Sequence, residues 1–166
     1  MLVLDLALLE REGAVQIDAD IPPDAPLWEE SGLTFDQPLE ARLRAHEAGS
    51  GEIVVTGRLK GHRSEPCRLC LDPVGLELEL EIVMVFGDAA ESGGEIRPLD
   101  PAVVKLELDE AVREEILLNV DRFVDCGPDC KGLCPDCGVN LNDETCDCTL
   151  DEPDPRWDAL RSLKIE

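Results

Sequence analysis

Aromatic side chains are scarce in this chain of 166 residues, which has no Tyr, three Phe and two Trp. The hydrophobic core must therefore be built from Leu, Val and Ile, and a core of this size leaves little margin of stability, so cross-links would matter. Base stacking on single-stranded nucleic acid is also disfavoured, because it needs aromatic rings at the surface.

A long apolar run is absent as well, since no segment approaches the roughly 20 residues that a membrane-spanning helix needs. The first residues, MLVLDLALLEREG, carry Asp5, Glu10 and Glu12 and no preceding basic region, which is unlike a secretory signal. We therefore expect a cytoplasmic protein without a membrane partner, in a reducing compartment where stable disulfides are uncommon.

Positive charge is the third scarcity, and the formal net charge is −23. Residues 1–41 hold ten acids and one base, whereas residues 42–68 hold six bases and three acids. So acidic a chain is repelled by phosphate at long range, which disfavours broad coating of nucleic acid and favours a basic partner protein. An acid-rich surface that serves only solubility would have the same composition.

Alternation of apolar and polar residues predicts an antiparallel sheet. Residues 39–46 and 53–60 alternate, and residues 75–86 give the longest such pattern, with Glu between apolar positions. Shorter strands are predicted at residues 3–6 and 15–18. Turns join the three long strands, so we expect a meander with one covered face.

Two helices are predicted after the meander. The first is predicted within residues 106–120, with Asp109 as its candidate N-cap. Its apolar stripe would cover the sheet and consists of Val112, Ile116, Val120 and Phe123. Near the C-terminus, Pro155 suits the first position of a short helix. The apolar face of that helix consists of Trp157, Leu160 and Leu163.

The polar face of the predicted sheet carries four bases in two pairs at i, i+2 spacing: Arg42 and Arg44, then Arg58 and Lys60. The favoured interpretation is cross-strand ion pairing with the glutamates at 77, 79 and 81. The alternative is an RNA contact through the same side chains and Arg63, which the scarcity of aromatics weakens.

The eight cysteines fall into four closely spaced pairs: Cys67 and Cys70, Cys126 and Cys130, Cys134 and Cys137, and Cys146 and Cys148. CxxC spacing is typical of a metal-binding turn that brings two thiolates to one ion, and four thiolates close a tetrahedral zinc site. We therefore predict two structural zinc sites. The compact grouping joins the last two pairs, and the first two pairs form the other site.

Redox and catalytic chemistry are the alternatives. A thioredoxin-like CxxC is expected in a βαβ context, whereas Cys67 and Cys70 lie between antiparallel strands. Catalytic zinc usually has a His ligand and an open position, and both histidines, His46 and His62, lie outside the cysteine motifs. Iron–sulfur binding stays open on spacing alone.

The predicted fold is α+β, in two parts. Residues 1–124 form the antiparallel β-meander covered by a helix and carry the first CxxC. Residues 125–166 form the Cys-rich zinc-binding segment with the short tail helix packed on it.

Four stretches of sequence carry a resemblance to a known family: CRLCL at 67–71, EAVREEILL at 110–118, CKGLCPDCGVNLN at 130–142 followed by CDC at 146–148, and DPRWDAL at 154–160. In this order they resemble the YceD family of large-ribosomal-subunit RNA accumulation proteins. The resemblance implies a bacterial or plastid factor needed for 23S ribosomal RNA accumulation and 50S subunit biogenesis. It brings no catalytic residue.

We therefore expect a non-enzymatic, zinc-stabilised adaptor that binds ribosomal or ribosome-assembly proteins, with pre-23S RNA as a second candidate and no small-molecule substrate. The alternative is a thiol oxidoreductase or a metal-dependent RNA-processing enzyme, which needs a reactive thiol or an open metal position. The candidate partner-binding residues are Arg42, Arg44, Arg58, Lys60, Trp157 and Leu160.

Overall fold

The computed structural model describes residues 1–49, 51–88 and 96–148. The predicted tail helix, with Trp157 and Leu160, lies outside the described residues, as does most of the loop that follows the third long strand.

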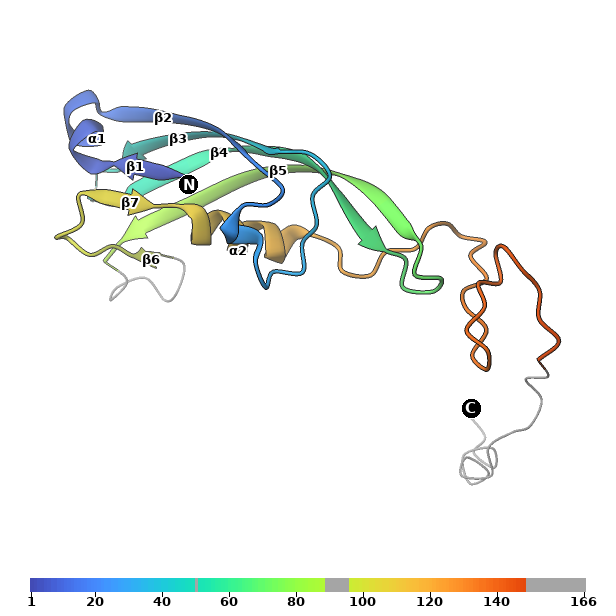
Figure 1. The fold of residues 1–166 in the computed structure, drawn as a ribbon. Coiled ribbons are helices and arrows are strands. Elements are labelled where there is room, and N and C mark those ends of the chain that lie inside the picture. The colour runs from blue at the N-terminus through green and yellow to red at the C-terminus, as the bar shows by residue number, and fades with distance from the viewer. Residues whose placement is uncertain (50, 89–95, 149–166) are drawn as a thin grey trace, which may run out of the picture.

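A five-stranded sheet forms the body of the molecule (Figure 1). Its strands, in spatial order, are β2 (Ala14–Ile21), β3 (Leu39–Glu47), β4 (Ile53–Pro66), β5 (Pro73–Gly87) and β6 (Arg97–Pro98). The first four are antiparallel neighbours, and β6 runs parallel to the end of β5. The predicted meander is therefore confirmed, with an additional short strand on one side.

The β4–β5 hairpin is longer than its neighbours and positions the first CxxC. β3 pairs with β4 only as far as Lys60, whereas β4 and β5 stay paired to Pro66 and Pro73. Figure 1 shows this hairpin extending past the other strands toward the Cys-rich segment.

The alternation of the sequence fixes which face of the sheet is buried. Along β3 the odd-numbered residues from Leu39 to Ala45 are buried and the intervening residues lie largely outside. On β5, Leu78, Ile82 and Met84 are buried, whereas Leu76 and Leu80, which also alternate with the glutamates, are only half-buried. This face, rich in aliphatic residues, contains much of the hydrophobic core.

Helix α2 (Asp109–Asn119) covers the buried face, as predicted, and contacts β5 and a short 3-10 helix, η1 (Pro26–Trp28). Ala111, Val112 and Ile116 are its buried residues. Trp28 is buried beside Phe35, with the two ring centroids 4.5 Å apart, so two of the few aromatic residues pack together here.

Two details of the predicted helix are wrong. Asp109 is the first helical residue, not the cap, and its carboxylate accepts a hydrogen bond from the Leu2 N–H at 2.6 Å. Phe123 lies beyond the end of α2, where the helical spacing no longer sets its direction, and is 80% exposed.

The N-terminal region also differs from prediction. Leu6 starts a helix, α1 (Leu6–Glu12), instead of continuing the strand β1 (Val3–Asp5). Asp5 caps α1 by accepting the Leu8 N–H at 3.1 Å, and Gly13 ends it with φ +74°. β1 pairs with β7 (Lys105–Glu107), so the first residues of the predicted helix at 106–120 are in a strand.

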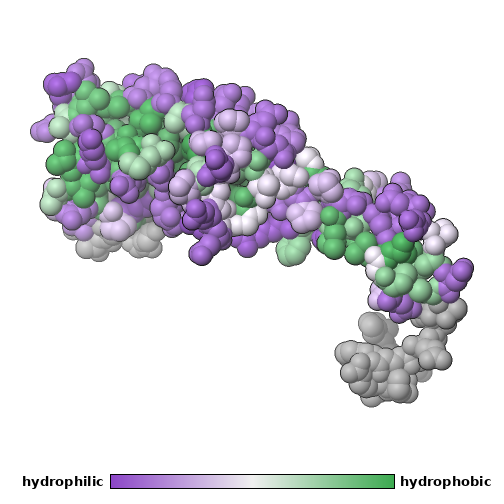
Figure 2. Space-filling view, viewed as in Figure 1, coloured by the Kyte–Doolittle hydropathy of each residue, from purple (hydrophilic) through white to green (hydrophobic). Residues whose placement is uncertain are grey.

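Hydrophilic residues cover most of the face shown in Figure 2, and hydrophobic ones gather at the β1–β7 end and over the Cys-rich segment. Within the described residues, neither α-helix has the length and apolar character needed to cross a membrane.

Candidate metal centres

The tip of the β4–β5 hairpin places the first two cysteines. Cys67 and Cys70 are buried in the turn between the strands, which closes through a hydrogen bond from the Leu71 N–H to the Cys67 carbonyl at 2.9 Å. Leu71 has φ +64°, a conformation that L-residues seldom adopt. The turn thus bends tightly enough to hold both thiols on one side.

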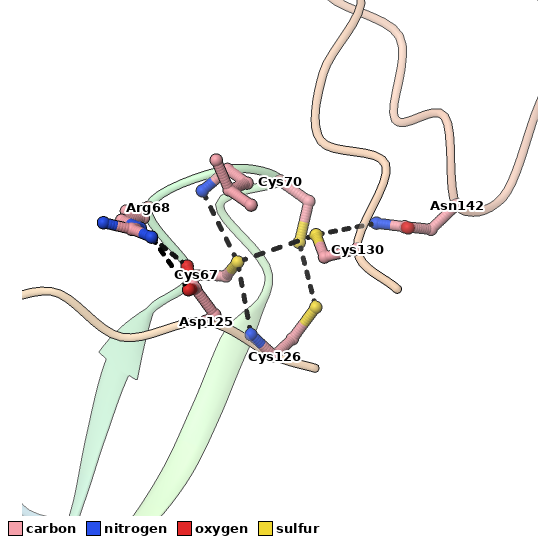
Figure 3. A network of polar contacts seen from close by, with 8 residues as sticks. Cys67, Arg68, Cys70, Asp125, Cys126, Cys130 and Asn142 are labelled. Atoms are coloured by element: carbon pink, nitrogen blue, oxygen red, sulfur yellow. Dashed lines mark hydrogen bonds and ion pairs between the residues drawn. The ribbon is translucent and has the colours of Figure 1, made fainter. Parts of the chain in front are cut away.

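The segment after α2 brings the next two cysteines to this tip. The Arg68 guanidinium makes two hydrogen bonds to the Asp125 carboxylate, at 2.7 and 3.0 Å, and the Arg68 N–H donates to the Val124 carbonyl at 2.9 Å. These contacts fix the chain just before Cys126. Figure 3 shows this pair beside the cysteine group.

The four sulfur atoms are spaced as a tetrahedral metal site requires. The Sγ atoms of Cys67 and Cys130 lie 3.9 Å apart, and those of Cys70 and Cys126 lie 3.6 Å apart (Figure 3). All four lie within 4.8 Å of one another. Zinc–thiolate bonds of about 2.3 Å place ligands at tetrahedral corners about 3.8 Å apart, so the group fits such an ion.

Backbone N–H groups favour the thiolate form of Cys67. Its Sγ accepts N–H groups from Leu69 at 3.5 Å and from Cys126 at 3.4 Å. A hydrogen bond from the backbone of Cys70 contributes most to lowering the pKa of Cys67 to about 6, with those from Leu69 and Cys126 adding to it and burial opposing it. A thiolate is the form that binds a metal.

The second group consists of Cys134, Cys137, Cys146 and Cys148, whose Sγ atoms also lie within 4.8 Å of one another. Its CPDCG turn closes through the Gly138 N–H, which donates to the Cys134 carbonyl at 2.9 Å, and Gly138 has φ +75°. Hydrogen bonds from the backbones of Cys137 and Asp136 lower the pKa of Cys134 to about 7. Each group therefore contains one acidified thiol.

Contacts between the two groups join the Cys-rich segment to the hairpin. The Leu133 N–H donates to the Leu69 carbonyl at 2.9 Å, and the Asn140 amide donates to the Asp72 carboxylate at 2.8 Å. The Asn142 amide donates to the Cys130 sulfur at 3.5 Å. These roles of the two asparagines were not predicted from the sequence, although their position just after the CPDCG turn was a usable signal.

The structure thus brings the eight cysteines together in the two sets that their spacing predicts, each positioned to hold a metal ion.

The predicted basic residues have different surroundings. Arg58 pairs with Glu81 at 2.9 Å and Glu79 at 3.6 Å, and Lys60 pairs with Glu79 at 3.0 Å, as expected. A hydrogen bond from Lys60 is the main cause that lowers the pKa of Glu79.

Arg42 pairs toward the other neighbouring strand, with Asp20 at 3.0 Å, and not with the glutamates of β5. Arg44 is exposed and has no ion pair within the described part of the chain. Arg63 is only 4% exposed and bonds Glu65 at 2.7 Å, so it is not available for an RNA contact.

Comparison with known proteins gives a family match. The model of the family described as "Large ribosomal RNA subunit accumulation protein YceD" matches residues 55–164. Uncharacterized proteins of Mycobacterium bovis and Mycobacterium tuberculosis are 29% identical over 126 residues, covering 74% of this chain and 60% of each relative. The chain therefore spans less than two thirds of these relatives. No solved structure matches it.

A plant relative carries the family's description in its own name. It is the "Large ribosomal RNA subunit accumulation protein YCED homolog 1, chloroplastic" of Arabidopsis thaliana, 33% identical over 64 residues. The match covers 39% of this chain and 20% of the relative.

Proposed function

Because the chain belongs to the YceD family of large ribosomal RNA subunit accumulation proteins, we propose that it is a non-enzymatic factor in large-subunit assembly. Its role is to support accumulation of 23S ribosomal RNA and 50S subunit biogenesis in the cytoplasm. It acts as an adaptor for basic ribosomal or ribosome-assembly proteins, which the net charge of −23 attracts.

The observation that carries this proposal is the ligand count of the two cysteine groups. Each group supplies four thiols within 4.8 Å of one another, which is a full tetrahedral set with no position left for water or substrate. A metalloenzyme needs an open position, so this arrangement favours a structural over a catalytic metal.

Zinc is the metal we propose for both groups. Zinc prefers four-coordinate thiolate sites and has no redox chemistry, so when bound it supplies a cross-link between chain segments. In the first group the cross-link joins the β4–β5 hairpin to the segment after α2. We propose a division into residues 1–124, which carry the sheet, the helix and the first CxxC, and residues 125–166, which carry the other six cysteines.

We also propose that acidic side chains of the partner contact Arg42, Arg44, Arg58 and Lys60 on the sheet, and that its apolar side chains contact Trp157 and Leu160 of the tail. The ion pairs of Arg58 and Lys60 with Glu79 and Glu81 weaken their availability to RNA. A protein partner is therefore favoured over pre-23S RNA.

Metal analysis tests the cofactor. The purified chain should carry about two zinc ions, with all eight thiols protected from alkylation. Cys67→Ser should lower the content to about one and leave the second group metallated. Native thiols that all react freely would favour the thiol oxidoreductase instead, and iron with sulfide would favour a cluster.

Depletion of the protein in its host tests the biological role. We expect a lower ratio of 23S to 16S RNA and fewer 50S particles on sucrose gradients, both restored by the unaltered chain. The ratio should stay low when the complementing chain is Cys67→Ser. An unchanged ratio after depletion would refute the proposed function.

A further inference from the structure

The outer edge of β5 is open over most of its length in the described part of the chain. On one side, β5 pairs with β4 from Pro73 to Phe86. On its other side, β5 pairs with β6 only at Phe86 and Gly87. Free strand edges are usually blocked, because their unpaired N–H and C=O groups bind other strands.

The register shows which backbone groups face outward. Leu99 donates its N–H to the Gly87 carbonyl, so the backbone of Gly87 faces away from β4. At the other end, the Cys67 N–H donates to the Asp72 carbonyl, so the backbone of Asp72 faces β4. The β4–β5 pairing is unbroken between these points. Backbone direction alternates along an antiparallel pair, so Glu77 and Glu79 present their N–H and C=O groups to the open edge.

A groove follows this edge. It has a volume of about 450 Å³, and five consecutive residues of β5, Leu76–Leu80, line one wall. Because successive side chains of a strand point to opposite faces, five consecutive lining residues place the groove along the backbone edge itself. The other wall is the chain after α2, including Phe123, which is 80% exposed.

The groove is acidic. Its acidic lining residues are Glu77, Glu79, Asp121 and Asp125. The basic residue in its lining, Arg63, is 4% exposed and already donates hydrogen bonds to the Glu65 carboxylate and the Asp121 carbonyl. Within the described residues, the carboxylates of Glu77 and Asp121 have no ion pair. An occupant that combines positive charge with an extended backbone would satisfy both the carboxylates and the unpaired edge groups.

We propose that this β5 edge groove binds an extended, basic segment of a partner protein as an added β-strand. The proposal rests on the adaptor role proposed above and names the surface and the kind of partner. A second copy of this chain is a poor occupant, because pairing two β5 edges would bring glutamates together. The carboxylates would likewise repel RNA.

A peptide probe tests the groove on the full, metal-loaded chain. The probe is a fluorescent nine-residue peptide of alternating Lys and Val. We expect binding by fluorescence anisotropy, and binding about tenfold weaker when alternate residues of the probe are N-methylated, since this removes the N–H donors that pair with the edge. A block peptide, with all Lys before all Val, controls for charge alone.

Glu77→Pro removes an outward N–H but no bond to β4, so the sheet should fold and the probe should bind about tenfold more weakly. The matched control, Glu77→Gln, keeps the N–H and should weaken binding by only about threefold. If Glu77→Pro fails to fold, Phe123→Ser, a surface change on the opposite wall, replaces it with the same expectation of weaker binding.

Several results would overturn the groove proposal. The first is that the N-methylated peptide or the block peptide binds as tightly as the probe. The second is that the Glu77→Pro chain, or the Phe123→Ser chain in its place, binds the probe like wild type. The third is that a peptide of residues 149–166 displaces the probe. A concentration-dependent dimer lost in Glu77→Pro would assign the edge to a second copy instead. If the probe does not bind but depletion lowers the ratio of 23S to 16S RNA, only the groove proposal is refuted. If depletion leaves the ratio unchanged, the proposed function is refuted.

Discussion

Arg58 and Arg63 lie on the same strand and have opposite surroundings. The Arg58 side chain is 49% exposed and pairs with exposed glutamates, whereas the Arg63 side chain is 4% exposed and bonds Glu65 and the Asp121 carbonyl. Phe35 forms a backbone β-bridge to Arg63, and the chain after α2 accepts a hydrogen bond from its guanidinium through the Asp121 carbonyl. This buried guanidinium joins the hairpin to the segment that leads to Cys126 and Cys130.

Replacing each arginine by Met measures this difference. Arg63→Met leaves Glu65 and the Asp121 carbonyl without their donor and should lower the free energy of unfolding by roughly 3 kcal/mol. Arg58→Met, the control, removes only an exposed pair and should cost about 0–1 kcal/mol. Urea unfolding of the three proteins gives both values. Equal losses would contradict the role assigned to Arg63.

Arg63 shows which contacts a local sequence pattern cannot predict. Arg63 was considered as an RNA contact, although the alternation that buries Val55 and Leu59 continues to position 63 and places its side chain inward. Its polar partners come from residues 65 and 121, and the second of these meets it only because of the tertiary fold.

At the scale of elements, strand pairing over long alternating runs was predictable and short non-local pairing was not. β3, β4 and β5 were found because their patterns are local and adjacent strands follow one another in the chain. β1 and β7 are three residues each and lie a hundred residues apart, so no sequence window contains their pairing. α1 had readable signals at Asp5 and Gly13, which cap its ends.

The cysteine groups were predictable for the same reason as the long strands. Each pair is a local turn with metal-ligand spacing, and only the joining of pairs needs the fold. The exposed position of Phe123 was not predictable, because helical periodicity continued past the residue at which α2 ends.

Gly57 marks a point where β3 and β4 approach too closely for a side chain. A Cβ at this position would lie 2.2 Å from the Arg42 carbonyl oxygen and 2.8 Å from the Leu43 Cα, both of which are backbone atoms. Gly57→Ala should therefore force the strands apart and lower the free energy of unfolding by about 1–3 kcal/mol. Thermal unfolding measures the effect.

The matched control is Gly49→Ala in the turn before β4, where a Cβ would meet nothing within 4 Å. This change should be neutral or slightly stabilising, because Ala restricts the unfolded chain more than Gly. Gly57→Ala with the same melting temperature as Gly49→Ala would show that the sheet can widen at no cost.

At the scale of the whole molecule, the hydrophobic core and the cysteine groups occupy different stretches of the described chain. The buried hydrophobic cluster runs from Leu2 to Ile116 and includes none of the described residues of the Cys-rich segment, 125–148. Beyond α2, the buried hydrophobic residues within the described part are Val124 and Cys134. With so little apolar burial, we expect this segment to depend for its folding on metal held by the two cysteine groups.

Removal of the metal should therefore unfold one part and spare the other. After treatment with a strong chelator, we expect backbone amides of residues 126–148 to exchange with solvent quickly, because the thiolates lose the ions that hold them together. Amides of β3, β4 and α2 should stay protected, because their hydrophobic packing is independent of the metal. Hydrogen exchange read by mass spectrometry follows both regions in one experiment, and returning zinc should restore protection. Simultaneous loss of protection throughout the sheet would contradict this division, since it would make the metal sites part of a single cooperative unit with the core.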